Sequence, residues 1–307
     1  MPLVESAGRW ARCTSMEPLA TPSVACIILN WNGWRDTLEC LASLARIDYP
    51  NLFVIVVDNG STDGSVEKIR RSYPGTALIE TGRNLGFGAG NNIGMRVALE
   101  RNADYIWLMN NDAQPQAEAL RALVRRAEEG TGLGAVGSVM FYADDPTRVQ
   151  AWGGGKVNIW TGTVLHAKSP VADSWFDYLT AASILLRRSA LQEVGLFDEG
   201  FFLYWEDTDL GFRLRKAGWT LATAADSIVL HKEHGSTGRN FRLLQRYAVA
   251  SSIRFMSKHS PLPWLSVLVS LSLKAGKKIA TGRLNQLGDI AGGIRDYFER
   301  RRQLAAH

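Results

Sequence analysis

Residues 201–214 read FFLYWEDTDLGFRL, an aromatic run followed by three carboxylates at Glu206, Asp207 and Asp209. Aromatic side chains favour a half-buried wall, whereas acids favour water or a partner. We therefore expect carboxylates at the lip of a lined pocket, where desolvation and like charge raise a carboxyl pKa. Apolar residues at helical spacing predict a helix from about residue 206 to Gly218. The alternative is that the acids merely complement the positive end of that helix.

The composition is that of a globular protein with one large domain or two, since 46% of the 307 residues are hydrophobic and 21% are charged. The cysteines at 13, 26 and 40 show no paired spacing, which predicts reduced thiols in a cytoplasmic protein. Residues 1–22 lack the apolar core of a secretory signal, so we expect a flexible N-terminal extension.

The net charge of +5 is unevenly distributed along the chain. Residues 239–307 hold 13 lysines and arginines against 3 acids, which leaves the first 238 residues acidic. This asymmetry argues against a nucleic-acid-binding protein and is typical of a basic tail that meets an anionic surface.

The first half of the chain alternates strands and helices. Apolar runs at 24–29, 52–57, 77–80 and 105–109 predict strands, and amphipathic segments at 35–45, 66–73, 87–101 and 115–129 predict helices. This alternation indicates an α/β fold with a mostly parallel, Rossmann-like sheet flanked by helices. Ligands bind such sheets at the carboxyl ends of the strands.

After residue 130 the expected strands become short and are separated by turns, which indicates mixed strands. We divide the chain into a catalytic domain at 23–240 and a basic, amphipathic helical region at 241–307. The catalytic domain has a nucleotide half at 23–130 and an acceptor half at 131–240.

The segment 58–65, DNGSTDGS, follows the second apolar strand. Asp58, at the strand end, is placed to accept a hydrogen bond from a base or a ribose hydroxyl, and the small residues let the backbone approach a ligand. The alternative is an ordinary turn stabilised by aspartate side chains.

The segment 83–92, RNLGFGAGNN, opens the third expected helix. Its glycines and Arg83 suit a phosphate at a helix N-terminus, and close helix packing is the alternative. The glycines do not follow the first strand, so they are a weak dinucleotide-binding motif.

Asn110, Asn111 and Asp112 end the fourth strand. A carboxylate here suits Mg²⁺ or Mn²⁺ shared with substrate phosphates. His231 or His234 is a candidate second ligand, because imidazole suits Mn²⁺ better than Mg²⁺. The alternative for His231 is a structural role at a strand end. Together these features favour transfer from a nucleotide-diphosphate donor to an acceptor hydroxyl.

The ordered motifs IILNWNG, VVDNGSTDGS, NLGFGAGNN, MNND and FDEGFFLYWEDTDL resemble those of family 2 glycosyltransferases, particularly the rhamnosyltransferase-like branch, over about residues 23–240. The resemblance implies a GT-A fold, an inverting mechanism and a divalent metal, Mg²⁺ or Mn²⁺.

The resemblance also implies residue roles. Asp207 is the expected general base, with Glu206 beside it, and Asp112 is the expected metal carboxylate, with His231 as a further ligand. Residues expected to hold the nucleotide are Asn30, Asn32, Asp58, Arg83, Asn84 and Asn111, with Asp58 at the base.

Two positions depart from the family pattern. The metal motif is often Asp-x-Asp, and Asn110 here lowers the ligand charge. The Ser-Gly before the acceptor-side strand is replaced by TAAS at 180–183.

The expected reaction moves L-rhamnose from dTDP-L-rhamnose to a glycan or lipid-linked acceptor in cell-surface polysaccharide synthesis, such as O-antigen. The alternatives are a UDP-linked hexose, N-acetylhexosamine or galactofuranose donor, a nucleotidyltransferase, and a non-catalytic nucleotide-sugar-binding module.

The C-terminal region pairs a basic helix at 239–257 with an apolar segment at 262–273, which is too short to span a membrane. Lysines and an arginine flank the apolar segment, and this pattern is typical of a peripheral anchor on the anionic inner face of the plasma membrane. A helix packed on the catalytic domain, or a homodimer contact, is the alternative.

Overall fold

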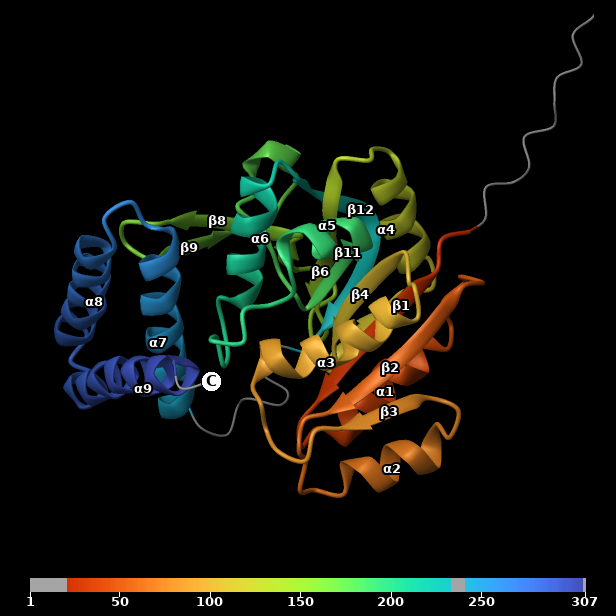
Figure 1. Cartoon of the computed structure of the whole chain (residues 1–307), viewed down its shortest axis with the longest axis horizontal. Coiled ribbons are helices and arrows are strands. Elements are labelled where there is room, and N and C mark those ends of the chain that lie inside the picture. Colours follow the sequence, from red (N-terminus) through yellow and green to blue (C-terminus); the bar gives the residue numbers. More distant parts are fainter. Residues whose placement is uncertain (1–20, 233–240, 306–307) are drawn as a thin grey trace, which may run out of the picture.

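The computed structural model describes residues 21–232 and 241–305. The expected extension at 1–22 therefore lies almost wholly outside the described residues. The chain forms a large sheet with strand order β3-β2-β1-β4-β11-β6-β12-β5, with β7 paired to β6, and a small sheet β10-β8-β9 (Figure 1). Helices cover the large sheet, and α7, α8 and α9 gather to one side of it (Figure 1).

The strands are β1 (Val24–Asn30), β2 (Leu52–Asp58), β3 (Ala77–Glu80), β4 (Tyr105–Asn110), β5 (Ala113–Pro115), β6 (Leu133–Tyr142), β7 (Val149–Trp152), β8 (Gly154–Asn158), β9 (Thr163–His166), β10 (Tyr178–Leu179), β11 (Ser183–Arg187) and β12 (Thr220–His231). The helices are α1 (Trp34–Leu44), α2 (Ser65–Ser72), α3 (Phe87–Glu100), α4 (Ala119–Glu128), α5 (Arg188–Val194), α6 (Glu206–Lys216), α7 (Phe241–His259), α8 (Pro263–Ala280) and α9 (Leu287–Ala305).

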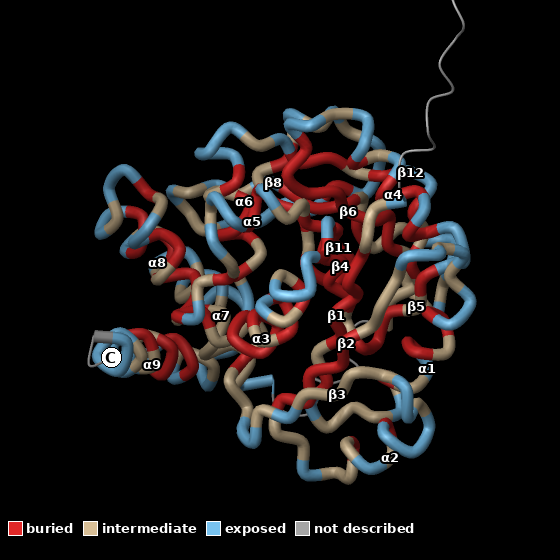
Figure 2. The backbone as a smooth tube through the Cα atoms, turned by 45° about the vertical axis from the view of Figure 1, so that its right-hand side comes forward, coloured by how far each residue is buried: buried red, intermediate tan, exposed pale blue. Residues whose placement is uncertain are grey.

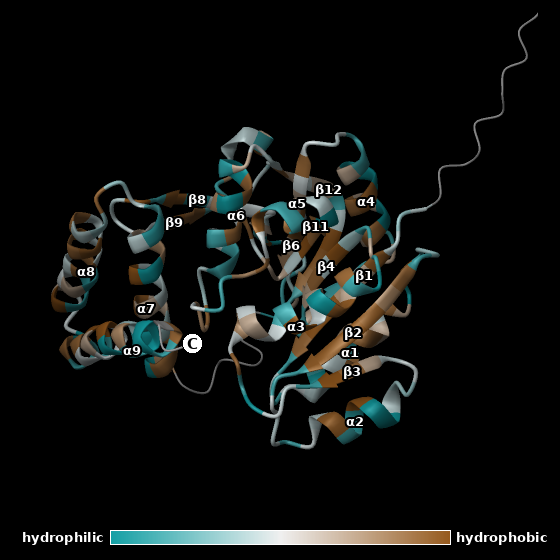
Figure 3. Cartoon of the chain, in the orientation of Figure 1, coloured by the Kyte–Doolittle hydropathy of each residue, from teal (hydrophilic) through white to brown (hydrophobic). Residues whose placement is uncertain are grey.

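The parallel half of the sheet confirms the expected order of strands and helices. Strands β3, β2, β1 and β4 pair in parallel, and their apolar runs are buried between helices on both faces (Figures 2 and 3). Strands buried on both faces need near-continuous apolar sequence, which β1 and β4 have. Cys26 and Cys40 are free thiols buried in this core.

The register of these strands brings their polar ends together. Asn30 pairs with Asp58, and Leu29 pairs with Asn110. Because parallel strands end at the same edge, the loops after β1, β2 and β4 meet there.

The second half is mixed, as expected. β11 runs antiparallel between β4 and β6, and β12 runs parallel to β6. The helix expected to begin at residue 115 begins at Ala119 instead. Ala113–Pro115 pairs with β12 as an edge strand, so its backbone is committed to the sheet before the helix can start.

Two glycines of α3 serve close packing on β1. A Cβ at Gly90 would lie 2.6 Å from Leu29 Cδ1, and one at Gly94 would lie 2.7 Å from Ile27 Cγ2. Gly86, before the helix, has φ +93°, and a Cβ there would meet the Phe202 carbonyl at 2.4 Å. These contacts support the packing interpretation of the glycine run.

The aromatic run before α6 joins the C-terminal helices to the rest of the molecule. Phe201 is fully buried in a third apolar cluster with Val249, Ile253 and Phe255 of α7. The Trp205 ring lies 4.7 Å from the Phe255 ring. The aromatic residues are therefore divided between the site and the packing of α7.

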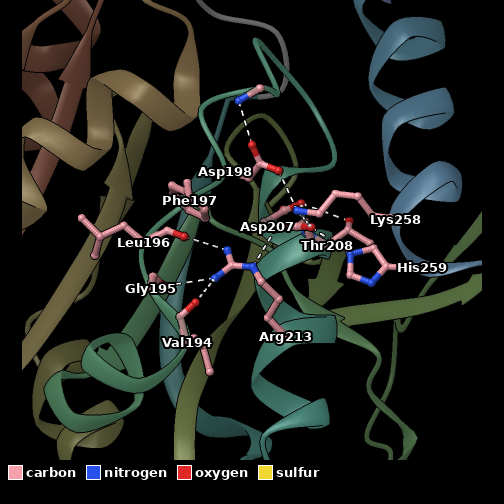
Figure 4. Close-up of polar contacts among 12 residues, drawn as sticks. Val194, Gly195, Leu196, Phe197, Asp198, Asp207, Thr208, Arg213, Lys258 and His259 are labelled. Carbon is pink, nitrogen blue, oxygen red and sulfur yellow. Dashed lines mark hydrogen bonds and ion pairs between the residues drawn. The ribbon is translucent and has the colours of Figure 1, made fainter. Parts of the chain in front are cut away.

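Asp209 is the polar centre of this contact. Its carboxylate is fully buried and pairs with Arg213 at 2.8 Å, with Lys258 at 2.6 Å and with His259 at 2.8 Å. Arg213 also donates to three backbone carbonyls at 194–196 (Figure 4). Burial alone would raise the pKa of Asp209, but the hydrogen bond from His259 and the charges of Arg213 and Lys258 hold that pKa well below its usual range.

We predict that Asp209→Asn lowers the free energy of unfolding by about 3–5 kcal/mol, because it leaves partly buried cations without their shared carboxylate. Urea unfolding of the full chain measures this change.

The matched control is Asp226→Asn. Asp226 pairs with Arg125 at 2.5 Å, but the two side chains are 75% and 58% exposed. This change should alter the free energy of unfolding by less than about 1 kcal/mol. Equal losses in the two variants would contradict the importance of the buried cluster.

Candidate active site

A cavity of about 900 Å³ opens at the carboxyl edge of the parallel strands. Its wall includes the loop after β1, the start of α3, the turn between β4 and β5, the start of α6 and the start of α7. The expected site residues that line it are Asn32, Asn84, Asn111, Asp112, Glu206, Asp207 and His231. Residues of all five motifs therefore meet at one cavity, to which the second motif contributes Asn59 and not Asp58.

Asn30 and Asp58 do not line the cavity, because their side chains are buried beneath the edge of the sheet. Asn30 Nδ2 donates to Asp58 Oδ2 at 2.7 Å, and Asp58 Oδ1 accepts from the Ser61 amide at 2.9 Å. Thr37 Oγ1 donates to Asn30 Oδ1 at 2.7 Å. The register of β1 and β2 places Asn30 and Asp58 side by side. Their side chains, which were expected to contact a nucleotide, hydrogen-bond to each other in this structure.

Arg83 is exposed outside the cavity wall, and its neighbour Asn84 forms part of that wall. Asn32 adopts φ 51°, and its Oδ1 accepts from the Thr62 amide at 2.7 Å. That contact ties the loop after β1 to the loop after β2.

Sequence reasoning missed Asn59. It is buried, and its Nδ2 donates to Asn84 Oδ1 and to the Gly86 carbonyl, each at 3.1 Å. Its Oδ1 accepts from the Leu85 amide at 3.0 Å. Asn59 thus holds the segment before α3 against the loop after β2. Its position directly after Asp58, at the end of a buried strand, is the sequence feature that could have identified it.

Trp31, also missed, lines the same cavity and is 38% exposed. An exposed indole on a cavity wall offers a flat face for a ring system.

Asp112 and His231 approach each other across the turn between β4 and β5 and the end of β12. Asp112 Oδ1 lies 3.2 Å from His231 Nε2, and Asn110 Nδ2 lies 3.1 Å from the same nitrogen. His231 Nδ1 lies 2.7 Å from Gln150 Oε1 on β7. Gln150 is a further residue that the sequence did not reveal.

The contact with Gln150 fixes the tautomer of His231. An amide oxygen only accepts, so Nδ1 carries a proton, and in a neutral ring Nε2 turns its lone pair towards the Asp112 carboxylate. In that tautomer Nε2 accepts a hydrogen bond from Asn110 Nδ2, which a cation shared by Nε2 and Asp112 Oδ1 would have to displace. His234 lies outside the described residues. Among the described residues, no group of three or more His, Cys, Asp and Glu side chains could hold a metal ion.

Glu206 and Asp207 begin α6 after two residues in an unfavourable conformation. Tyr204 has φ 69° and Trp205 has φ 71°, both in the left-handed region. Each such bulky residue costs about 1–3 kcal/mol. The turn aims the first residues of α6 at the cavity.

The two acids differ in their hydrogen bonds. Glu206 is 5% exposed, and no partner within the described residues reaches its Oε2. Asp207 Oδ2 accepts from the Ala181 amide at 3.2 Å, and Oδ1 accepts from the Thr208 amide at 2.7 Å. Backbone donors favour a charged carboxylate, and they reach both oxygens of Asp207, whereas the backbone hydrogen bonds to Glu206 leave its Oε2 without a partner among the described residues.

The pKa values agree with this asymmetry. Burial, followed by the charge of Asp207, raises the pKa of Glu206 to about 8. Burial also raises the pKa of Asp207, but the Ala181 and Thr208 hydrogen bonds oppose that shift. Burial thus raises the pKa of both acids, and the value of about 8 belongs to Glu206.

Comparison with known proteins gives consistent matches. The family model described as "Glycosyl transferase family 2" matches residues 25–195. The chain is 31% identical over 264 residues to the N-acetylglucosaminyl-diphospho-decaprenol L-rhamnosyltransferase of Mycobacterium tuberculosis, covering 76% of this chain and 86% of that protein. It is 25% identical over 247 residues to rhamnosyltransferase WbbL of Escherichia coli, covering 76% of this chain and 92% of that protein.

The fold also matches solved structures. A mannosyltransferase from Pyrobaculum calidifontis, solved with GDP-Man and Mn²⁺, superposes with a TM-score of 0.58 at 18% identity. The match covers 90% of this chain and 87% of that one. The expected GT-A fold is confirmed.

The raised pKa of Glu206, about 8, predicts a pH-dependent stability. An unfolded glutamate has a pKa of about 4.3, so between the two values the folded protein holds a proton that the unfolded chain releases. Stability then falls as pH rises from about 4.3 to 8, by at most about 1.4 kcal/mol per pH unit. Glutamine at position 206 does not titrate, so Glu206→Gln lacks this loss of stability with rising pH. The variant should therefore become more stable relative to the native protein as the pH rises from 5 to 8.

Thermal unfolding at pH 5, 6.5 and 8 measures the difference. Glu67→Gln is the control, because Glu67 is exposed at the start of α2. Its profile should run parallel to that of the native protein. A parallel profile for Glu206→Gln as well would refute the buried-proton assignment.

Proposed function

Because the chain belongs to glycosyl transferase family 2 and is a glycosyltransferase, we propose that it moves L-rhamnose from dTDP-L-rhamnose to a hydroxyl of a lipid-linked glycan acceptor in cell-surface polysaccharide synthesis. Two similar proteins are named as rhamnosyltransferases, and the name of one includes a sugar carried on a polyprenyl diphosphate. The observation that carries this proposal is the meeting of Asp207, Glu206, Asp112 and His231 at one cavity.

The donor nucleotide is assigned to the wall formed by Asn32, Asn84 and Asn111, with its base on the Trp31 face. Asn30 and Asp58 hold the loops under this wall, and the expected contact between Asp58 and the base stays a prediction. Arg83, exposed beside Asn84, is assigned to the diphosphate.

The metal assignment fits the contacts of this chain. Asp112 Oδ1 and His231 Nε2, 3.2 Å apart, would hold Mn²⁺ or Mg²⁺ together with the donor phosphates. A divalent ion there neutralises the charge that builds on the leaving diphosphate. Gln150 orients His231 as outer partners of metal ligands commonly do. Asn110 contributes no charge, so the protein ligands proposed for the metal ion are one carboxylate and one imidazole.

Asp207 is proposed as the general base. Both of its carboxylate oxygens accept hydrogen bonds from backbone amides. The acceptor oxygen bonds to the anomeric carbon as the bond from that carbon to the diphosphate breaks, and Asp207 takes the acceptor proton. A single displacement of this kind inverts the anomeric configuration. Glu206, which keeps its own proton, leaves the negative charge on Asp207.

We predict that Asp207→Asn lowers turnover of dTDP-L-rhamnose by about 10²–10⁴-fold, because the acceptor proton has no carboxylate to receive it. The acceptor is N-acetylglucosamine on a short isoprenyl diphosphate, and the readout is release of dTDP.

Donor binding should survive in this variant. The thermal stabilisation of the protein by dTDP with Mn²⁺, compared with EDTA, should match that of the native chain. Asp226→Asn serves as the control with unchanged turnover. Near-normal turnover in Asp207→Asn would remove the base assignment, and no turnover of dTDP-L-rhamnose by the native protein would remove the donor assignment.

The same proposal places the C-terminal region at the cytoplasmic face of the membrane that carries the acceptor. None of the described helices combines the length and apolarity needed to cross a membrane. Instead α8, which lies far from the large sheet (Figure 1), exposes Trp264 at 74%, Leu268 at 63% and Ile279 at 57% of their surfaces. At 100° per residue these positions share one helix face.

The basic residues near α8 divide into two groups. Lys258 forms ion pairs with Asp198 and Asp209. Lys274 donates to Ser270 Oγ at 2.6 Å, and burial lowers the pKa of Lys274 to about 8. The cations left for an anionic surface are Lys277, Lys278 and Arg283. An apolar face beside these cations complements an anionic bilayer.

We predict that the pair Trp264→Glu and Leu268→Glu lowers binding of the full chain to vesicles containing phosphatidylglycerol by at least about tenfold, since both changes put charge on the apolar face. Co-sedimentation at low salt measures the bound fraction, with phosphatidylcholine vesicles as the uncharged comparison.

Leu165→Glu is the matched control, because Leu165 is 64% exposed on β9 and lies outside α8. Its binding should equal that of the native chain. Equal binding by the α8 variant would remove the membrane assignment and leave the enzymatic proposal standing.

A further inference from the structure

A second cavity, of about 220 Å³, lies between α7 and α9. It shares Phe202, Leu243 and Tyr247 with the wall of the large cavity, so the two are neighbours. Its size suits a head group better than a whole ligand, since pockets for complete small ligands start at about 300 Å³.

Arginines dominate this second cavity. Arg246, Arg254, Arg300 and Arg301 line it, against two carboxylates, Asp296 and Glu299. Two of the four are already neutralised. Arg246 forms a two-pronged ion pair with Asp296, and Arg254 donates to both oxygens of Asp198, which lies outside the lining.

Arg300 has no such partner. Within residues 21–232 and 241–305, no carboxylate lies at ion-pair distance from its guanidinium and no hydrogen bond from it is formed. Its guanidinium carbon lies 4.7 Å from the centre of the Phe202 ring. Burial lowers the pKa of Arg300, and the like charge of Arg254 adds to this shift, while Tyr247 and Asp296 oppose it. A half-buried cation whose neighbour is also positive is stabilised most by an anion with several oxygens.

Phe202 connects this cation to the active site. Its ring centre lies 4.6 Å from that of Tyr247, so Phe202 contacts both Tyr247 and Arg300. Its carbonyl accepts from the Phe87 amide at 2.7 Å, at the start of α3. The residue that orients Arg300 is therefore fixed to the wall of the large cavity.

We propose that Arg300 and the cavity between α7 and α9 bind the phosphate groups of the acceptor's lipid carrier. This inference rests on the proposed function, in which a lipid-linked diphosphate brings the acceptor sugar to Asp207. The donor diphosphate is assigned to Asp112 and His231, so the second cavity is left for a separate anion. The apolar face of α8 belongs to the same helical unit and would meet the lipid tail at the bilayer.

The test uses the full chain saturated with dTDP and Mn²⁺, so that the donor site is occupied. Calorimetric titration with geranyl diphosphate gives the dissociation constant. Arg300→Gln should raise that constant by about tenfold or more, because it removes a charge-assisted, two-pronged contact. Arg300→Lys keeps the positive charge but loses the two-pronged geometry of the guanidinium. Its dissociation constant should therefore lie between those of the native chain and Arg300→Gln.

Arg302→Gln is the matched control, because Arg302 is exposed on the same helix and does not line the cavity. Its dissociation constant should equal that of the native chain. Equal weakening by Arg300→Gln and Arg302→Gln would show only a general charge effect and would overturn the proposal, as would undetectable binding to the native chain. Unfolding midpoints of all variants confirm that they are folded.

Inorganic pyrophosphate and geraniol separate the sources of the signal. If pyrophosphate binds as tightly as geranyl diphosphate, with the same dependence on Arg300, the ligand is a free anion and the lipid assignment fails. If dTDP itself does not bind, the donor part of the proposed function fails, while the dependence on Arg300 is still measured in its own titration without dTDP.

Discussion

The buried carboxylate of Asp209 is the interaction on which the arrangement of the site depends. Asp209 lies on α6 only two residues after Asp207, and it binds Arg213 of its own helix and Lys258 and His259 of α7. Because α6 is rigid over that distance, fixing Asp209 also fixes the direction of Asp207 and Glu206 towards the cavity. The same contact attaches α7, whose first residues form part of the cavity wall. One charge cluster thus positions both Glu206 and Asp207 and the part of the cavity wall that α7 forms.

The nucleotide side is organised by amides instead of charges. Asn30 binds Asp58, Asn59 binds the segment before α3, and Asn32 binds the loop after β2. Asparagine can donate and accept at once, so each one ties two loops together at an edge where backbone groups lose their strand partners. The glycines of α3 contribute by letting that helix pack closely on β1. The loops are therefore held in place before any donor arrives.

Two pairs of side chains in the cavity have different surroundings and are suited to different chemical roles. Glu206 and Asp207 are neighbours in sequence, yet backbone amides reach both oxygens of Asp207 and leave Glu206 Oε2 without a partner among the described residues. Asp112 and His231 come from distant parts of the chain and meet because β5 pairs with β12. The first pair suits proton removal and the second suits a cation. The arginine cavity beside Phe202 adds a separate place for negative charge on the acceptor side.

The sequence alone determined the parallel half of the sheet, because buried parallel strands need unbroken apolar runs and their polar ends must meet at one edge. It also predicted Asp207, Glu206, Asp112 and His231 as site residues, and the structure brings these four to one cavity. Only the tertiary structure decided that Asn30 and Asp58 face each other, that Gln150 orients His231 and that Arg300 faces a cavity. These contacts join residues that lie 28, 81 and roughly a hundred positions apart, where chain order places no limit on which side chains meet.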